Sequence, residues 1–384
     1  MSRTRRRATI LGAAAASVVA GVALLPNWSA GAAVVDDPTV DAQTKATFQK
    51  LADAVFTDRT DALVEGAHGR GGKPLTGGFS GDVKVSASTA RTEDAALSTL
   101  GRRKDQLAKA GEKYSRANTT VTLNATRVTG RTAKAAVTET TTLTYAQARG
   151  GAPRTTGFQA RHELTFKADQ QGTWQLTDVE DTDQGGLAVN TLSKPVSVKA
   201  TTADDTMPDA PRAATTRNPV AVPKTGTAYD YKAMAAYAEK YWNVYNKDYP
   251  DYNGHADGGD CTNFVSQSLK AGGWKHVPGY VYDYTKWFGN ADIQSDSFVG
   301  VNEWSWFAQN SKRTTSLANV YQLEVGDVLQ MDFDRDGSKD HTMIVTAKSG
   351  GVPYVTYHSN NTFRRSVASL VASYPNAAYY AYRT

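Results

Sequence analysis

Cysteine is almost absent from this chain, since Cys261 is the only one among 384 residues. A single cysteine excludes an intrachain disulfide framework and cysteine-rich zinc sites, and the six scattered histidines show no ligand spacing that could replace them. A lone cysteine is either an inert, buried side chain or a thiol with a chemical role.

An excess of charge of one sign is also absent. The chain has 43 Lys and Arg against 38 Asp and Glu, a formal net charge of +5. Four of these bases lie in the first seven residues (Arg3, Arg5, Arg6 and Arg7), and without them the balance is 39 to 38. A near-neutral chain lacks the basic surface that a nucleic-acid partner requires.

Long hydrophobic runs are limited to residues 10–25, which follow the arginines and precede the Ala-Gly-Ala of residues 30–32. This order is typical of a secretory signal peptide, so we expect residues 1–32 to be removed and the protein to be secreted, with cell-wall association a further option. The run is short for a transmembrane helix, and we expect no membrane contact after cleavage. An uncleaved anchor is the alternative, and the export route stays open. A secreted protein normally pairs its cysteines, which favours a role for Cys261.

The first half, residues 33–192, reads as a smaller α+β module. Apolar residues at helical spacing predict a helix from about Asp41, and a second is expected at residues 93–113, although Gly101 weakens it. Alternating patterns then predict antiparallel strands near residues 121–125, 158–166 and 174–176. The element order resembles cystatin-like or NTF2-like shapes.

No catalytic pattern is found in this module. His162 lies on the apolar face of a predicted strand, which indicates a hydrogen-bonded core histidine. A spacer or partner-binding role is preferred to an inhibitory pro-domain. Residues 193–228 hold five of the 13 prolines and no aromatic residue, which is typical of a semi-rigid linker.

The second half, residues 229–384, begins with a helix that Pro250 ends. After Gly258 and Gly259, Asp260 is expected to cap a helix that starts at Cys261 and ends before Gly272. The thiol would lie in the first helical turn, where unpaired backbone N–H groups favour a thiolate. The Cys261 N–H is a candidate oxyanion donor, a second donor is expected from Asn253 or His255 in the preceding loop, and Asp260 is expected to support the site.

Strands are predicted at residues 328–333, 341–347 and 352–360. A two-residue turn at Gly350 and Gly351 would place Asn360 opposite His341, and a turn one residue earlier would place His358 there. Both registers put the even-numbered residues of the last strand on the face of His341. A cysteine nucleophile needs a base and a group that orients it, so the candidate catalytic residues are Cys261, His341 and either Asn360 or His358.

These motifs resemble the putative amidase domain of secreted bacterial proteins, a branch of the papain-like superfamily related to the CHAP amidases. The strings that carry the resemblance are Asp-Cys-Thr-Asn-Phe-Val-Ser-Gln at residues 260–267, Gly-Asp-Val at 326–328, Asp-His-Thr at 340–342 and Tyr-His-Ser-Asn at 357–360. The resemblance covers about residues 229–384. It implies a papain-like cysteine hydrolase domain with a Cys–His–polar site for an amide or peptide bond. Cell-wall peptides, such as those of peptidoglycan, are the expected substrate class. Cys261 and His341 carry over, and the third residue stays open.

An acidic segment precedes His341. Its residues match the start of an EF-hand calcium loop and are Asp332, Asp334, Asp336, Ser338 and Asp340. Met343, however, occupies the position of the final glutamate of such a loop. Either calcium stiffens this loop, or it is an exposed turn whose charges Arg335 and Lys339 balance. No other cofactor is expected.

The sequence therefore predicts a secreted cysteine amidase or peptidase. Two alternatives remain: a catalytically silent module that binds cell wall or glycan, and a transpeptidase or acyl transferase using the same nucleophile.

Overall fold

The computed structural model describes residues 41–66, 83–148, 150–183, 187–192, 197, 207–225, 229–253 and 259–384. The described residues form one compact unit. The predicted signal peptide lies outside the described residues, and so do residues 193–196, 198–206 and 226–228 of the predicted linker. None of the described helices has the length and apolar character needed to cross a membrane.

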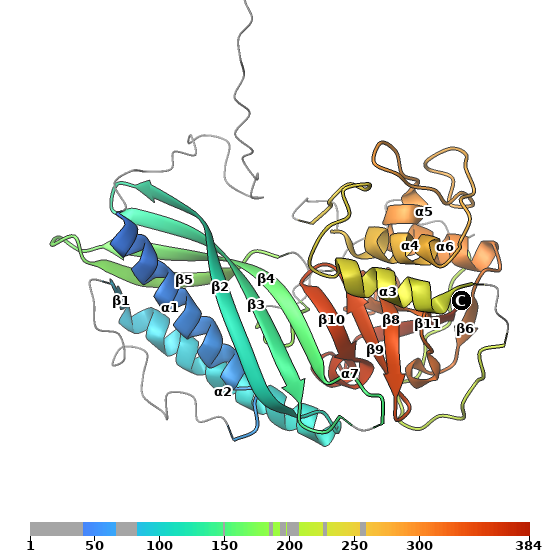
Figure 1. Cartoon of the computed structure of the whole chain (residues 1–384), viewed down its shortest axis with the longest axis horizontal. Coiled ribbons are helices and arrows are strands. Elements are labelled where there is room, and N and C mark those ends of the chain that lie inside the picture. The colour runs from blue at the N-terminus through green and yellow to red at the C-terminus, as the bar shows by residue number, and fades with distance from the viewer. Residues whose placement is uncertain are drawn as a thin grey trace, which may run out of the picture. The chain divides into compact units, whose positions relative to one another are not determined.

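The first half packs two helices, α1 (Ala42–Asp61) and α2 (Ala87–Lys109), on one face of an antiparallel sheet (Figure 1). The sheet consists of β2 (Tyr114–Thr129), β3 (Thr132–Tyr145), β4 (Thr155–Ala168) and β5 (Trp174–Asp181), and the short β1 (Val83–Val85) pairs in parallel with β5.

The two predicted helices of this half are confirmed, but the second begins and ends earlier than predicted, at Ala87 and Lys109. Asp41 caps α1, since its carboxylate accepts the Thr44 N–H at 2.8 Å. The second helix begins at Ala87, capped by Ser86, and runs through Gly101. The predicted strands are also present but much longer, because each is paired along most of its length with a neighbour.

The sheet of the first half continues into the second. Strand β10 (Asn361–Ser366) pairs with β4, and β9 (Val352–Tyr357), β8 (His341–Ser349), β7 (Val328–Asp332), β11 (Ala378–Arg383) and β6 (Thr315–Leu317) follow in that order. Among the described residues, eleven strands thus form one mixed sheet, and the overall class is mixed α/β. The backbone pairing of β4 with β10 therefore joins the two halves.

Two hydrophobic cores cover the second half of the sheet. Over one face lie α3 (Tyr231–Tyr241), α4 (Cys261–Ala271), α5 (Asp296–Val299) and α6 (Val301–Asn310), and the Phe264 and Val265 side chains pack there with Ile344. We call this the α4 face. The α7 face carries α7 (Val367–Ser373) and the short helix η2 (Val320–Gln322), and its core contains Met343, Val345 and Tyr357.

A segment that follows β5 is inserted into the α7 face. The Leu187 side chain is fully buried in that core. The Leu187 carbonyl accepts hydrogen bonds from the Tyr357 hydroxyl at 3.0 Å and from the buried Arg365 guanidinium. From α2, Arg103 donates to the carbonyls of Val189 and Thr191 at 2.8 and 2.6 Å. Side chains therefore fasten this segment to both halves.

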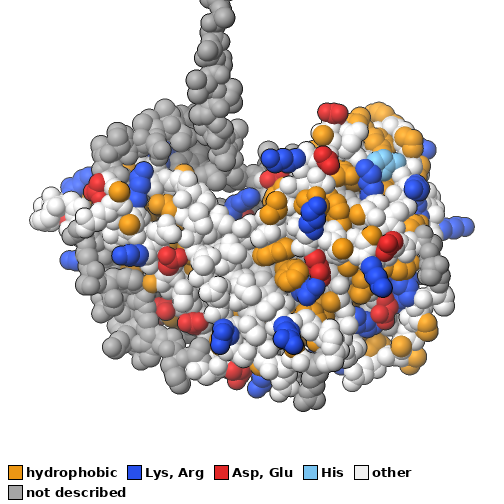
Figure 2. All heavy atoms as spheres, viewed as in Figure 1, with side chains coloured by type: hydrophobic (Ala, Val, Ile, Leu, Met, Phe, Trp, Pro, Cys, Tyr) orange, Lys and Arg blue, Asp and Glu red, His pale blue; other side chains and the backbone are white. Residues whose placement is uncertain are grey.

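Charged groups on the surface are mixed in sign. On the face drawn in Figure 2, Lys and Arg side chains alternate with Asp and Glu over the described residues. This distribution agrees with the near-neutral composition expected after loss of the first residues.

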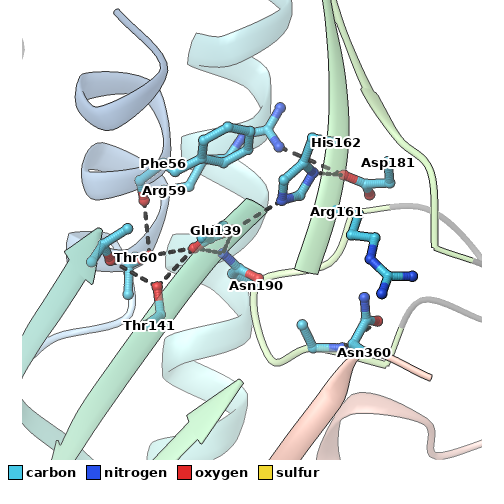
Figure 3. A network of polar contacts seen from close by, with 12 residues as sticks. Phe56, Arg59, Thr60, Glu139, Thr141, Arg161, His162, Asp181, Asn190 and Asn360 are labelled. Atoms are coloured by element: carbon cyan, nitrogen blue, oxygen red, sulfur yellow. Dashed lines mark hydrogen bonds and ion pairs between the residues drawn. The ribbon is translucent and has the colours of Figure 1, made fainter. Parts of the chain in front are cut away.

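A buried polar network crosses the first half between α1 and the sheet (Figure 3). Arg59 and Glu93 form a two-pronged ion pair at 2.9 and 2.7 Å. His162 contacts Glu139 through Nε2 at 3.1 Å and Asp181 through Nδ1 at 3.0 Å, and its ring stacks on Phe56. The prediction of a hydrogen-bonded core histidine is confirmed.

This network gives the protein a pH-dependent stability. Burial by itself would lower the pKa of His162, but the hydrogen bonds and charges of Asp181 and Glu139 outweigh it and raise that pKa to about 9. A raised folded-state pKa stabilises the fold fully below the unfolded value of about 6.5, and the stabilisation is lost as pH rises through about 9.

We predict that the free energy of unfolding falls by about 3 kcal/mol between pH 6.5 and 9.5 because His162 loses its proton. Urea unfolding across this range measures it. The His162→Gln variant should be less stable and should lose most of the slope, whereas His276→Gln, at an exposed histidine, should keep it. An unchanged slope in His162→Gln would contradict the assignment.

Candidate functional site

The predicted cysteine helix is confirmed as α4, with Cys261 as its first residue and Gly272 as its C-cap. Gly259 has φ +83°, a backbone angle that favours glycine, and it turns the chain into the helix. The Cys261 side chain is free and only 1% exposed. Thr262 Oγ1 lies 2.9 Å from Thr342 Oγ1, which places the start of α4 over the first residues of β8 on the α4 face.

The expected capping role of Asp260 is corrected by the structure. Its carboxylate caps no N–H of α4. It instead accepts from the Asn263 side chain at 2.7 Å and from the Tyr252 N–H at 3.2 Å. Its second oxygen lies 2.6 Å from Nδ1 of His358. The residue before the cysteine therefore holds an imidazole.

His358 is packed against the cysteine helix. Its ring stacks on Phe264 of α4 with centroids 4.0 Å apart and lies 4.5 Å from the Tyr245 ring. Its Nε2 is 2.8 Å from the Tyr241 carbonyl oxygen. Both ring nitrogens thus face oxygen acceptors, so each contact is a hydrogen bond only when its nitrogen carries hydrogen.

The thiol of Cys261 is in its neutral form at neutral pH in this arrangement. Burial raises the pKa of the thiol above its usual 9, while hydrogen bonds from the Thr342 backbone and from Thr262 act in the opposite direction. The hydroxyl of Thr262 is 3.7 Å from Sγ. No hydrogen bond joins Sγ to either His341 or His358 among the described residues.

A β-bulge corrects the predicted register. Ser349 pairs with Val352, as the two-residue turn requires, but the pairing shifts at Thr346, so that Val345 pairs with Val355. A shift of one residue exchanges the faces of a strand. His341 therefore shares the α7 face with Tyr357, whereas His358 follows Thr356 on the α4 face. The prediction that even-numbered residues share the face of His341 is wrong.

His341 lies at the start of β8 with its ring edge-on to Tyr357, at a centroid distance of 4.9 Å. Its Nε2 is buried without a hydrogen-bond partner in the described part of the chain. Burial, and then the charge of Arg365, lowers the pKa of His341 to about 3, so the ring is neutral. The structure does not bring this ring into hydrogen-bond contact with Cys261.

Asn360 and Asn253 also differ from expectation. Asn360 accepts hydrogen bonds from the Leu187 and Ala188 N–H groups and donates to Asp183 at 2.7 Å, so it fastens the inserted segment and not an imidazole. The Asn253 amide donates to the Tyr245 hydroxyl and to Asn361, at 3.1 Å in the second case. Asn253 thus orders the loop before the helix, and His255 lies outside the described residues.

Tyr245, Asn361 and Tyr241 were not predicted as site residues, because their contacts join segments that are far apart in the sequence. Ser359 has φ +123°, a strained value for a residue other than glycine, between His358 and Asn360. Such strain persists only where surrounding contacts hold the backbone.

Three residues of the acidic segment converge. Carboxylate oxygens of Asp332, Asp334 and Asp340 lie within 4.8 Å of one another. Lys339, expected to balance them, is directed instead to Asp209, 3.2 Å away, and to the Tyr380 ring. Asp336 caps the Ser338 N–H at 2.8 Å. An all-oxygen set of this kind fits a hard cation such as calcium.

Comparisons with known proteins support an amidase domain in the second half. Residues 228–382 match the family described as "Putative amidase domain". The resemblance inferred from the motifs is confirmed at this level, while the papain-like relationship and secretion stay predictions.

Two proteins of Bacillus subtilis (strain 168) are similar over a limited region. "Uncharacterized protein YhbB" is 36% identical over 143 residues, which are 35% of this chain and 44% of that protein. "Uncharacterized protein YjcM" is 33% identical over 140 residues, 35% of this chain and 31% of that protein. The chain therefore spans less than half of the length of either relative.

Among solved structures, the crystal structure of a conserved protein from Planctomyces limnophilus DSM 3776 covers 36% of this chain and 94% of its own, at 15% identity and a TM-score of 0.18. No conclusion about the fold rests on that likeness.

The neutral thiol yields a direct prediction. We expect the rate of Cys261 alkylation by iodoacetamide in the native protein to keep rising beyond pH 9, because burial raises the thiol pKa. Mass spectrometry of the labelled chain measures the rate. The same chain unfolded in urea is the control, and its alkylation rate should level off once the pH passes the ordinary thiol pKa. A native plateau that begins below pH 7 would contradict this arrangement.

Proposed function

We propose that residues 228–382 hydrolyse an amide bond with Cys261 as the nucleophile, in a papain-like arrangement. The observation that carries the proposal is the position of Cys261 at the first residue of α4, directly after Asp260, which holds His358 on the same face of the sheet. The family match over residues 228–382 supports the reaction class.

In the proposed reaction, His358 is the imidazole that serves the thiol. Asp260 keeps the imidazole hydrogen on Nδ1. Nε2 must turn from the Tyr241 carbonyl oxygen toward Cys261 before it accepts the proton of the thiol. The thiolate attacks the amide carbonyl, the proton passes from Nε2 to the departing amine, and water then cleaves the thioester. Unpaired N–H groups at the start of α4 would stabilise the oxyanion.

His341 is the alternative base, as the sequence motif implies. Its neutral state suits a base, but its ring lies on the α7 face against Tyr357. Service to Cys261 would require the start of β8 to rearrange. The variants below separate the two histidines.

We also propose that the chain is exported after loss of residues 1–32 and that its substrate belongs to the peptides of the cell wall. The basic and apolar order of the first residues supports export. The buried thiol, on the other hand, favours a second candidate, a silent module that binds cell wall or glycan without turnover.

The assay is the release of free amino groups, with the gain of one water by mass, from peptidoglycan-derived peptides incubated with the full chain. We expect Cys261→Ser to lower the rate by about a thousandfold or more and His358→Gln by about a hundredfold or more. His276→Gln, at an exposed histidine, is the matched control and should be unaffected.

Each other outcome has a distinct meaning. Full activity in Cys261→Ser refutes the proposed function. Loss of activity in His341→Gln with retention in His358→Gln would assign the base to His341. Peptide binding without release of amine would favour the silent module, and transfer to an added amine in place of water would favour an acyl transferase.

We further propose that Asp332, Asp334 and Asp340 bind calcium, because three carboxylates within 4.8 Å of one another repel unless a cation compensates. Calcium should raise the midpoint of thermal unfolding by a few degrees over EDTA, and Asp334→Asn should abolish the rise. Asp336→Asn, with the same loss of charge outside the cluster, should keep most of it. An equal midpoint with and without calcium would refute the site.

A further inference from the structure

The first half of the chain contributes a cation beside the cysteine helix. Strand β4 pairs with β10 at Gln159 and Asn361, and the two side chains meet at 3.4 Å. The side-chain oxygen Oδ1 of Asn361 accepts from the Tyr245 hydroxyl at 2.9 Å and from the Asn253 amide at 3.1 Å, and both donors lie in the segment that leads to Cys261. Gln159 therefore lies on the α4 face. Arg161, two residues further along β4, lies on the same face.

The guanidinium of Arg161 has no hydrogen bond or ion pair with any described residue. Only its backbone is engaged, through the Asp183 carboxylate at 2.8 Å and the Thr182 N–H at 3.0 Å. The residue is half-buried, and Figure 3 shows its side chain directed away from the His162 network.

The charge of Arg161 is felt at the cysteine loop. Burial raises the pKa values of Tyr245 and Asp251, and the positive charge of Arg161 acts on both in the opposite direction. Tyr245 in turn contacts His358. The guanidinium is thus close enough to influence the groups that surround the proposed nucleophile.

The nearby carboxylates already have other partners. Asp183 accepts from the Asn360 amide, Asp251 accepts from the Asn253 N–H at 2.9 Å, and Asp260 is paired with His358. Burial raises the pKa of Asp183 and the charge of Arg161 acts to lower it, but the guanidinium forms no hydrogen bond or ion pair with a described residue. Its five donors in a planar fork are therefore suited to receive a carboxylate from outside the protein.

We propose that Arg161 binds a carboxylate of the substrate, next to the amide bond that Cys261 attacks. The inference rests on the proposed function and narrows its substrate to amides that carry a free carboxylate near the scissile bond. It also gives the first half a task in the reaction, since β4 supplies a specificity residue to a site built by the second half.

The test compares two alkylating probes of nearly equal size, iodoacetate with a carboxylate and iodoacetamide with a carboxamide, on Cys261 of the full chain. The measured quantity is the labelling rate with iodoacetate divided by the labelling rate with iodoacetamide, both at one pH. We expect this ratio to fall about threefold or more in Arg161→Gln, and less in Arg161→Lys, which keeps the charge. Added salt should reduce the ratio in the native chain.

Arg116→Gln, an exposed arginine on β2, removes the same charge two strands away and should leave the ratio unchanged. Far-ultraviolet circular dichroism and the thermal midpoint confirm that each variant is folded. Equal ratios in the native chain and Arg161→Gln overturn the inference and leave the role of Cys261 intact. No labelling of Cys261 by either probe at any pH removes the proposed function and the inference together.

The carboxylate could be a chain terminus or an acidic side chain, and protection of Cys261 from iodoacetamide distinguishes them. Acetyl-glycyl-glycine offers the terminus, and acetyl-glutamyl-glycine amide offers the side chain. The peptide that protects Cys261 more strongly in the native chain than in Arg161→Gln identifies the kind of carboxylate that Arg161 binds. Protection by neither peptide overturns the assignment.

Discussion

The bulge at Thr346 determines which histidine lies on the same face of the sheet as the cysteine helix. On the turn side of the bulge, β8 and β9 follow the register of a two-residue turn, and beyond it every side chain of one strand is displaced by one position relative to the other. Tyr357 then faces the α7 core with His341, and His358 faces α4 with Cys261. The stacked Phe264 and the Asp260 carboxylate hold His358 in that position. The assignment of His358 as the proposed base depends on Thr346, the residue that the pairing of β8 with β9 skips.

The pairing of β4 with β10 has a second effect on the site. Without it, the α4 face would end at β10, and the loop around Tyr245 and Asn253 would be open at that edge. With it, Gln159 and Arg161 extend the same face by one strand. The first half thus contributes to the sheet face on which the proposed nucleophile lies, a role that composition and element order alone did not suggest.

Much of the fold could be predicted from local patterns. The spacing of Phe48, Leu51 and Val55 identified α1, and the glycines around Cys261 identified both ends of α4, because helices leave periodic and capping signals in short windows of sequence. The turn at Gly350 was equally readable. The bulge was not, since a one-residue shift leaves the alternating pattern plausible in either register. Strand β10, which pairs with β4, lies about 200 residues further along the chain, and no local pattern can specify pairing at that separation.

The sequence patterns identified candidate residues for the site, but not the contacts that those residues make in the fold. Cys261 and His358 lie together, but Asp260 holds an imidazole where a helix cap was expected, and Asn360 fastens Leu187 and Ala188. Each of these side chains has a partner from another segment, and only the folded chain reveals which partner is within reach.

The buried position of Leu187 bears on what proteolysis could do to this protein. A cut after residue 192 would sever the chain without freeing its halves, because Asn360, Arg365 and the strand β10 would still grip the first fragment. The cleaved protein would behave as a tight complex of two polypeptides that separates only under denaturing conditions.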